Sequence, residues 1–318
     1  MNRRSLGKTG IHVSEVAFGG VEIGIPYGIG VESAADMISE AQAIDLLNAS
    51  FDSGINFYDT ARQYGQSESI IGKAFENKRE QVIIATKCKH FFDEHGGIPA
   101  YSELKRIIET SLKESLGALR TDYVDVFMLH QGSMQLLENE DVQRIFSDLK
   151  KIGVIRATGV STYTPEETRK SIETGSWDVI QLPFNLMDQR QAALFSLASG
   201  AGVGIVVRSV LMKGLLSGRG KNLHPSLGEV ENHIRHCDAL AEQSRIELST
   251  LATKFALAFR EVSSILVGLD RMEYLHKCLE ACNGDALDKK VMVRARQLAY
   301  GHPEFLNLHT WSVKGWLK

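Results

Sequence analysis

Polar residues suited to catalysis stand at the ends of three successive apolar segments of the sequence. Asp59 closes Ile-Asn-Phe-Tyr-Asp, Lys87 closes Val-Ile-Ile-Ala-Thr-Lys, and His130 closes Val-Asp-Val-Phe-Met-Leu-His. Any one of them has a simple structural explanation, because a buried strand ends where the chain meets solvent. A carboxylate, an amine and an imidazole at three successive strand ends are better explained as one site that holds and moves protons.

A fourth candidate is Tyr64, which lies in the loop that follows Asp59. A lone loop tyrosine is normally an amphipathic surface group. Gly65 beside it permits a tight turn, and such a turn could aim the ring toward the other three groups.

The elements that must position these residues alternate between short apolar strands and amphipathic helices. Most strand segments are nearly continuous apolar runs, which is typical of parallel strands buried on both faces. Strands are expected at Val13–Gly19, Ile55–Asp59, Val82–Lys87, Val124–His130, Arg156–Ser161, Val179–Asn185, Gly204–Ser209 and Ser264–Gly268. Helices are expected at Ala41–Asp52, Glu68–Glu76, Ser102–Leu119, Val142–Ile152, Pro165–Glu173, Ala192–Ser199 and Arg271–Ala281.

Eight strands separated by helices predict right-handed βαβ units that close into a (β/α)8 TIM barrel. We expect a single barrel domain over residues 1–318. An open dinucleotide-binding sheet needs GxGxxG at its first strand–helix turn, and the turn from Phe18 to Gly24 lacks that spacing. The polar segment Arg219–Glu231 is expected to form a long loop after the seventh strand, and a tail follows from Asn283.

Composition and charge exclude several classes of partner. The 318 residues carry a net charge of −3 with both signs scattered, so no basic stripe indicates nucleic acid. The N-terminal MNRRSLGKTG lacks the apolar core of a signal peptide, and no run is long enough to span a membrane. The four cysteines form no CxxC pair and are expected to be reduced, as in a cytoplasmic protein. We expect no metal, a small-molecule substrate, and a monomer or small homo-oligomer.

The residues from Asn56 to Glu68 read Asn-Phe-Tyr-Asp-Thr-Ala-x-x-Tyr-Gly-x-Ser-Glu. This string resembles the signature of the aldo-keto reductase superfamily, and the likeness extends from Leu6 to about Cys278. Its further marks follow in order as Lys87, His130, Gly159-Val160-Ser161, Gln181 with Asn185, and Gly214-Leu215-Leu216-Ser217-Gly218. The resemblance implies an NAD(P)-dependent oxidoreductase whose catalytic residues are Asp59, Tyr64, Lys87 and His130.

The chemistry of that tetrad follows from the residue types. Tyrosine is a poor proton donor at neutral pH, because its reference pKa is about 10. Lys87, held charged by Asp59, would favour the phenolate and lower the pKa of Tyr64. His130 would donate to or orient the carbonyl oxygen beside Tyr64. A histidine at position 130 favours carbonyl chemistry over reduction of a carbon–carbon double bond.

The resemblance also implies where the cofactor binds. Ser161, Thr162 and Gln181 occupy positions that bind the nicotinamide carboxamide, with Thr162 in place of the usual asparagine. Arg208 stands where many members carry an aromatic residue, and its planar guanidinium could stack on the ring instead. The full set of cofactor contacts implied is Gly20, Val21, Ser161, Thr162, Gln181, Arg208, Ser209, Leu211, Gly214, Gly268, Asp270, Tyr274 and Cys278.

Asp270 bears on the choice between NAD and NADP. A carboxylate there would repel a 2′-phosphate and could accept from a ribose 2′-hydroxyl, which favours NAD. The residues in this segment fit two other roles. Asp270 could instead be the N-cap of the following helix, and Arg271 and Lys277 could serve a phosphate.

The substrate is expected to be a sugar or polyhydroxylated aldehyde, and the activity that of an aldose or sugar dehydrogenase or reductase in carbohydrate metabolism. Glu22 and His90 could meet hydroxyl groups, and walls are expected from Val21, Tyr58, Phe91-Phe92 and the C-terminal tail. Two other functions fit the same residues. Lys87 could form a Schiff base as in aldolases, or the barrel could bind a nicotinamide cofactor without catalysis.

Overall fold

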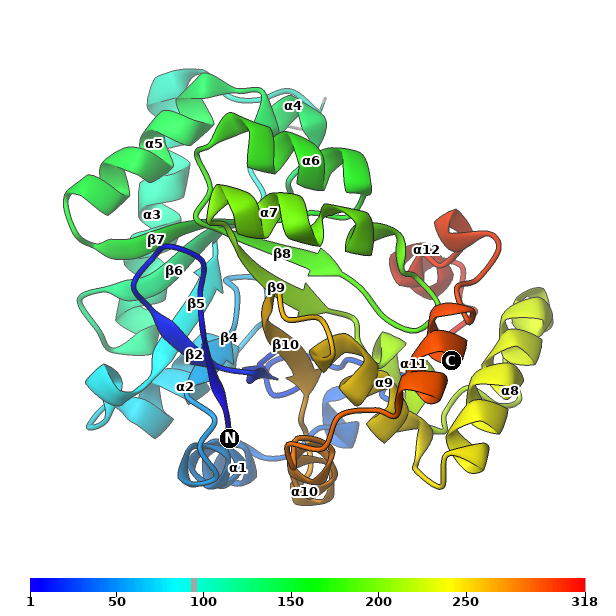
Figure 1. Ribbon diagram of the computed structural model, residues 1–318. Coiled ribbons are helices and arrows are strands. Elements are labelled where there is room, and N and C mark those ends of the chain that lie inside the picture. The colour runs from blue at the N-terminus through cyan, green and yellow to red at the C-terminus, as the bar shows by residue number, and fades with distance from the viewer. Residues whose placement is uncertain (93–95, 318) are drawn as a thin grey trace.

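The computed structural model describes residues 1–92 and 96–317. Eight parallel strands form a closed barrel in the order β10-β3-β4-β5-β6-β7-β8-β9 (Figure 1). They are β3 (Val16–Gly19), β4 (Phe57–Asp59), β5 (Ile83–Lys87), β6 (Val124–Leu129), β7 (Ile155–Ser161), β8 (Val179–Pro183), β9 (Gly204–Arg208) and β10 (Val262–Gly268). The predicted (β/α)8 barrel is confirmed.

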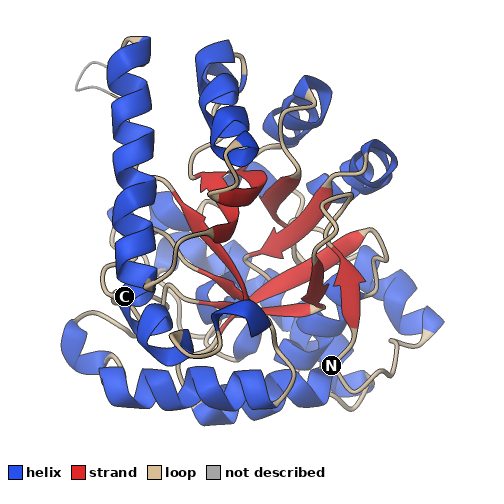
Figure 2. Ribbon diagram, turned by 90° about the vertical axis from the view of Figure 1, so that its left-hand side faces the viewer, coloured by secondary structure: helices blue, strands red, loops and turns tan. Residues whose placement is uncertain are grey.

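Helices surround the barrel and connect consecutive strands (Figure 2). Thr164 caps α6, with Pro165 at the first helical position and Glu167 completing the capping box. The α-helices are α1 (Glu40–Asp52), α2 (Ser67–Phe75), α3 (Tyr101–Leu119), α4 (Met134–Leu137), α5 (Glu140–Lys151), α6 (Pro165–Thr174), α7 (Phe195–Ala201), α8 (Gly228–Gln243), α9 (Leu248–Leu257), α10 (Met272–Ala281), α11 (Lys289–Arg296) and α12 (Leu308–Val313).

The first predicted strand, Val13–Gly19, is in fact two strands. Its beginning belongs to β2 (His12–Ser14), which pairs antiparallel with the unpredicted strand β1 (Arg3–Ser5). This hairpin closes the end of the barrel where the strands begin: the Lys8 amide donates to the Gly202 carbonyl at 2.8 Å. Local periodicity does not distinguish the two strands because both present apolar residues to one core.

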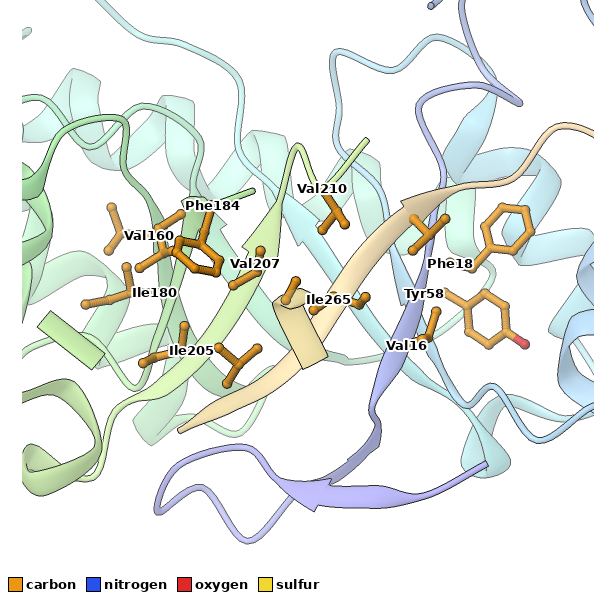
Figure 3. Packing of buried hydrophobic residues seen from close by; sticks show 14 of the residues in the cluster. Val16, Phe18, Tyr58, Val160, Ile180, Phe184, Ile205, Val207, Val210 and Ile265 are labelled. Carbon is orange, nitrogen blue, oxygen red and sulfur yellow. The ribbon is translucent and has the colours of Figure 1, made fainter. Parts of the chain in front are cut away.

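Side chains along each barrel strand alternate between two apolar layers. The inner layer is small and is closed at its base by Leu6, Ile11 and Val13 of the hairpin. The outer layer lies between strands and helices, where Phe18 and Tyr58 sit side by side (Figure 3). The inner residues of the strands are Ala17, Phe57, Ala85, Val126, Met128, Ala157, Val179 and Val206.

Two other predictions require correction. The segment Arg219–Glu231 is a loop only in part, because α8 begins at Gly228 and buries Val230. The predicted helix Ala192–Ser199 is a 3-10 turn, Arg190–Leu194, followed by α7. The tail after Asn283 contains α11 and α12. Within the described ranges, no helix combines the length and apolar character needed to cross a bilayer.

Candidate active site

The alternation of side chains brings the predicted polar residues together at the end of the barrel where the strands finish. Phe57 and Ala85 point into the barrel, so Asp59 and Lys87, each an even number of residues later on its strand, also point inward. His130 lies two residues after Met128, which faces inward, so His130 also points inward. Gln181 follows Val179 in the same way. The strands β4, β5, β6 and β8 thus aim polar groups at one point.

Lys87 and Asp59 form a buried ion pair at the bottom of this site. The Lys87 ammonium donates to Asp59 Oδ1 at 2.5 Å and to the Thr60 carbonyl at 3.0 Å. Gln181 Nε2 donates to the other Asp59 oxygen at 2.8 Å. The side chains of Lys87 and Asp59 are only 1% and 4% exposed. Burial lowers the pKa of Lys87, and Asp59 opposes that shift.

The loop that carries Tyr64 is held from two sides. Arg62 donates to Glu68, and Thr86 of β5 donates to the other oxygen of Glu68 at 2.6 Å. On the other side, Gly24 packs against the loop so closely that a Cβ there would lie 1.9 Å from the Tyr64 carbonyl oxygen. Gly65 takes a positive φ of 53°, as a tight turn requires. Gly65 and Glu68, which both belong to the sequence signature, therefore help to position Tyr64.

Tyr64 lies against both Lys87 and His130. The Lys87 ammonium is 4.8 Å from the centroid of the Tyr64 ring, over its face. The rings of Tyr64 and His130 meet edge to face with centroids 5.6 Å apart. The pKa of Tyr64 is raised by burial and by Asp59, so the expected lowering by Lys87 is wrong for this structure. The phenol is held neutral, as a proton donor must be.

His130 is a neutral imidazole. Burial, followed by the positive charge of Lys87, lowers its pKa to about 2. The ring of His90 lies 5.1 Å away. His130 Nδ1 is buried and has no hydrogen-bond partner within the described part of the chain. A neutral imidazole carries one N–H, so it can donate a hydrogen bond to a substrate oxygen without bringing a charge.

These groups form one end of a cavity of about 610 Å³. The other end is reached at Asp270, which follows β10. Of the thirteen cofactor contacts predicted, all but Thr162 lie in the wall. Those in the wall are Gly20, Val21, Ser161, Gln181, Arg208, Ser209, Leu211, Gly214, Gly268, Asp270, Tyr274 and Cys278.

Thr162 points the other way. Ser161 faces inward on β7, so the next residue faces the helices. There the hydroxyl of Thr162 shares a hydrogen bond of 2.7 Å with that of Thr168 in α6. Its backbone carbonyl accepts from Arg208 at 2.9 Å. Thr162 thus positions Arg208, whose guanidinium also lies 4.5 Å from the centroid of the Tyr163 ring.

The segment after β9 is strained where it borders the cavity. Ser209, Met212 and Lys213 all have positive φ angles, between 49° and 61°. Such conformations cost of order 1–3 kcal/mol each outside glycine and concentrate at functional sites. Asn185 helps to hold this segment, since its amide donates to the Ser209 carbonyl at 3.2 Å. Gly214 follows with a φ of 102°.

At the far end of the cavity, the ammonium of Lys277 is paired with two carboxylates. Lys277 contacts both Glu247 and Glu273 at 3.3 Å. The alternative role of Asp270 as a helix N-cap is wrong, because α10 begins at Met272 and its N-cap position falls on Arg271, which makes no side-chain cap. Asp270 instead lies in the cavity wall.

Sequence reasoning missed several wall residues and misplaced others. Tyr58 faces the outer layer, where it shares a hydrogen bond of 3.2 Å with Ser50, because its neighbours Phe57 and Asp59 take the inward positions. Phe91 and Phe92 pack against the outer core. The tail does contribute to the wall, as expected. In the tail, the wall residues include Leu306 to His309. Wall residues that were not predicted include Tyr27, Tyr163, Lys213, Arg219, Ser249 and Thr253.

The Aldo/keto reductase family model matches residues 15–299. The chain belongs to this family. The L-galactose dehydrogenase of Arabidopsis thaliana is 29% identical over 296 residues, which cover 87% of each chain. The NADH-specific methylglyoxal reductase of Escherichia coli is 27% identical over 311 residues, covering 89% of this chain and 94% of the relative. The holo form of aldo-keto reductase AKR11C1 from Bacillus halodurans superposes with a TM-score of 0.78 at 27% identity, covering 94% of this chain and 96% of that one.

Family membership implies an oxidoreductase that uses NAD(P)H and acts on a small-molecule carbonyl. The relatives differ in the substrates that their names state. The substrate and the choice of nucleotide for this chain must therefore be argued from its own residues.

Proposed function

We propose that this chain interconverts a carbonyl and an alcohol by hydride transfer, with Tyr64 as proton donor and acceptor. One observation carries the proposal. Tyr64 lies between the buried Lys87–Asp59 pair and the neutral His130, at one end of a cavity of about 610 Å³. The nicotinamide, when bound, supplies the hydride.

The protein groups handle the proton. His130 donates a hydrogen bond to the carbonyl oxygen and polarises it. As negative charge develops on that oxygen, Tyr64 transfers its phenolic proton to it. The phenolate left behind is stabilised by the Lys87 ammonium over its ring, and Asp59 keeps that ammonium charged. In the oxidative direction, Tyr64 takes the proton back.

The residues at the far end of the cavity favour NAD over NADP. Asp270 would repel a 2′-phosphate, and the positive charge of Lys277 is already offset by Glu247 and Glu273. The nearby Arg219 donates to the Tyr274 hydroxyl at 2.9 Å. The name of the NADH-specific relative agrees with this preference.

A sugar or polyhydroxylated aldehyde is the substrate class that we propose. Hydroxyl groups need donors and acceptors along the pocket wall, and the wall includes Tyr27, Asn185, Asp188, Arg190 and His309. The relative named L-galactose dehydrogenase acts on such a compound. Oxidation of a sugar lactol with NAD⁺ is the reaction that we infer.

The Schiff-base alternative lacks support. A Schiff base needs a neutral, accessible amine, but the Lys87 ammonium is bound to Asp59 and Thr60. Lys87 also lies beneath the cavity wall rather than in it.

The test combines binding and turnover. NADH and NADPH are titrated against intrinsic fluorescence, and sugar-dependent NADH formation is then followed for wild type and Tyr64→Phe. We expect NADH to bind more tightly, and Tyr64→Phe to bind it equally well while losing 10²–10⁴-fold in kcat, roughly the share of general acid–base catalysis. Equal turnover by Tyr64→Phe would contradict the assigned role. A failure of both nucleotides to bind would contradict the proposed function itself.

A further inference from the structure

Glu22 is a partly buried acid in the cavity wall that the proposed chemistry does not use. It follows β3 and lies directly on β10: a Cβ built on Gly268 would lie 2.0 Å from Glu22 Oε1. Its second oxygen, Oε2, is buried and finds no hydrogen-bond partner among the residues described. A buried polar atom without a partner is costly, and this one borders the cavity.

The charges around Glu22 disfavour its ionisation. Asp59 from β4 and Asp270 from the loop after β10 both act against a further negative charge, and Lys213 from the segment after β9 acts in its favour. Lys213 does not pair with Glu22, however. Its ammonium donates to Ser312 of α12 at 2.9 Å and lies over the Tyr27 ring.

Burial, with the help of these carboxylates, raises the pKa of Glu22 to about 8. At neutral pH the side chain is therefore mainly a carboxylic acid with an O–H to donate. Glu22 rests on Gly268, two residues before Asp270, and lines the same cavity as His130, so a dinucleotide that extends from His130 to Asp270 passes it. The middle of a dinucleotide is its ribose–pyrophosphate portion, which is rich in acceptor oxygens and negatively charged.

We propose that Glu22 binds the dinucleotide as a neutral carboxylic acid, donating its O–H to an oxygen of the ribose–pyrophosphate portion, so that affinity falls when Glu22 ionises. This inference rests on the proposed function, because it requires a dinucleotide in the cavity. An ionised Glu22 would offer no donor and would repel the phosphates. Binding above the pKa of free Glu22 is then coupled to uptake of one proton.

The other titratable groups that face Glu22 do not reproduce this behaviour. The pKa values of Tyr27 and Tyr64 are raised by burial, so both phenols stay neutral at mildly alkaline pH. The pKa of Lys213 is lowered by burial. Loss of its positive charge would also weaken phosphate binding as pH rises, so Glu22 and Lys213 must be separated by substitution.

The experiment measures the Kd of NAD⁺ and of NADH between pH 6 and 9.5 for wild type, Glu22→Gln and Lys213→Met. From linkage with a pKa of about 8, the wild-type Kd rises about tenfold between pH 7 and 9. Glu22→Gln keeps a donor and cannot ionise, so its Kd stays flat and is about tenfold lower than that of wild type at pH 9. Lys213→Met binds more weakly at every pH but keeps the rise.

Calorimetry in two buffers of different ionisation enthalpy counts the protons directly. At pH 9 wild type takes up about 0.9 proton per dinucleotide, and Glu22→Gln takes up almost none. If Glu22→Gln does not fold, the proton counts of wild type and Lys213→Met decide the question.

Two results would overturn the inference while leaving the proposed function intact: dinucleotide binding by wild type without proton uptake at pH 9, or the same pH dependence in Glu22→Gln as in wild type. Absence of dinucleotide binding by wild type at every pH would instead refute the proposed function.

Discussion

Replacing Asp59 by asparagine removes the charge that faces Lys87 while preserving the volume of the side chain. The Lys87 ammonium lies 2.5 Å from Asp59 Oδ1, with both side chains almost fully buried. Removing one partner of such a pair leaves an uncompensated buried charge and costs about 3–5 kcal/mol. The Thr60 carbonyl still accepts from Lys87 in the variant, so we expect the lower end, about 3 kcal/mol.

A double-mutant cycle measures the interaction energy of Lys87 with Asp59 separately from the effect of each substitution on other contacts. Lys87→Met alone leaves Asp59 buried without its cation and should also destabilise the fold. The double variant Asp59→Asn with Lys87→Met lacks both charges. Its free energy of unfolding should be about 2–4 kcal/mol higher than the sum of the two single losses implies. Independent sites deviate from additivity by only ~0.5 kcal/mol. The free energies of unfolding are measured in urea by circular dichroism and tryptophan fluorescence at pH 7.

The same variant has a defined pH dependence. Burial lowers the pKa of Lys87, and in wild type Asp59 opposes this. In Asp59→Asn the pKa of Lys87 falls further below that of an unfolded lysine, so the destabilisation is present at low pH and shrinks as pH rises toward about 10, where the unfolded state also loses its proton. A loss under about 1 kcal/mol at pH 7, strict additivity in the cycle, or a penalty that grows with pH would refute the reasoning.

Three further substitutions or measurements test other parts of the site. Gly24→Ala would place a Cβ 1.9 Å from the Tyr64 carbonyl oxygen, so kcat should fall about tenfold or more because Tyr64 is misplaced. Gly117→Ala is the matched control, since no atom lies within 4 Å of its new Cβ, and it should keep wild-type kcat. The pH profile of kcat should show no inflection from His130 between pH 5 and 8, because its pKa is lowered to about 2; an inflection near pH 6.5 that disappears in His130→Gln would contradict this. Asp270→Ser should shift the ratio of the Kd values of NADP⁺ and NAD⁺ toward NADP⁺ by about tenfold, and an unchanged ratio would show that Asp270 does not face the ribose.

The main features of the barrel and the positions of the tetrad were predictable from the sequence. Parallel strands buried on both faces read as apolar runs, and three successive runs end at a residue that cannot be buried without a partner. Asp59, Lys87 and His130 were recognisable for that reason. Period-two alternation also decides which strand residues face inward, and it separates Ser161 from Thr162 and Asp59 from Tyr58.

Contacts between distant segments required the tertiary structure. The pairing of β1 with β2 and the start of α8 depend on contacts with distant residues, and the local sequence pattern does not indicate these contacts. The electrostatic state of a side chain is non-local in the same way. Its pKa depends on burial and on charges brought near by the fold.

Glu22, Tyr64 and Lys87 illustrate the difference between what the sequence determines and what the tertiary structure determines. The sequence by itself determined their chemical types, the strands or loops that carry them, and the family to which the arrangement belongs. Only the tertiary structure decided that Glu22 rests on Gly268 near two other carboxylates, and that burial and Asp59 raise the pKa of Tyr64. The physical reason for this difference is that apolar periodicity is a local property of the sequence. Desolvation and Coulomb interactions depend on distances between residues that are set only when the barrel has closed.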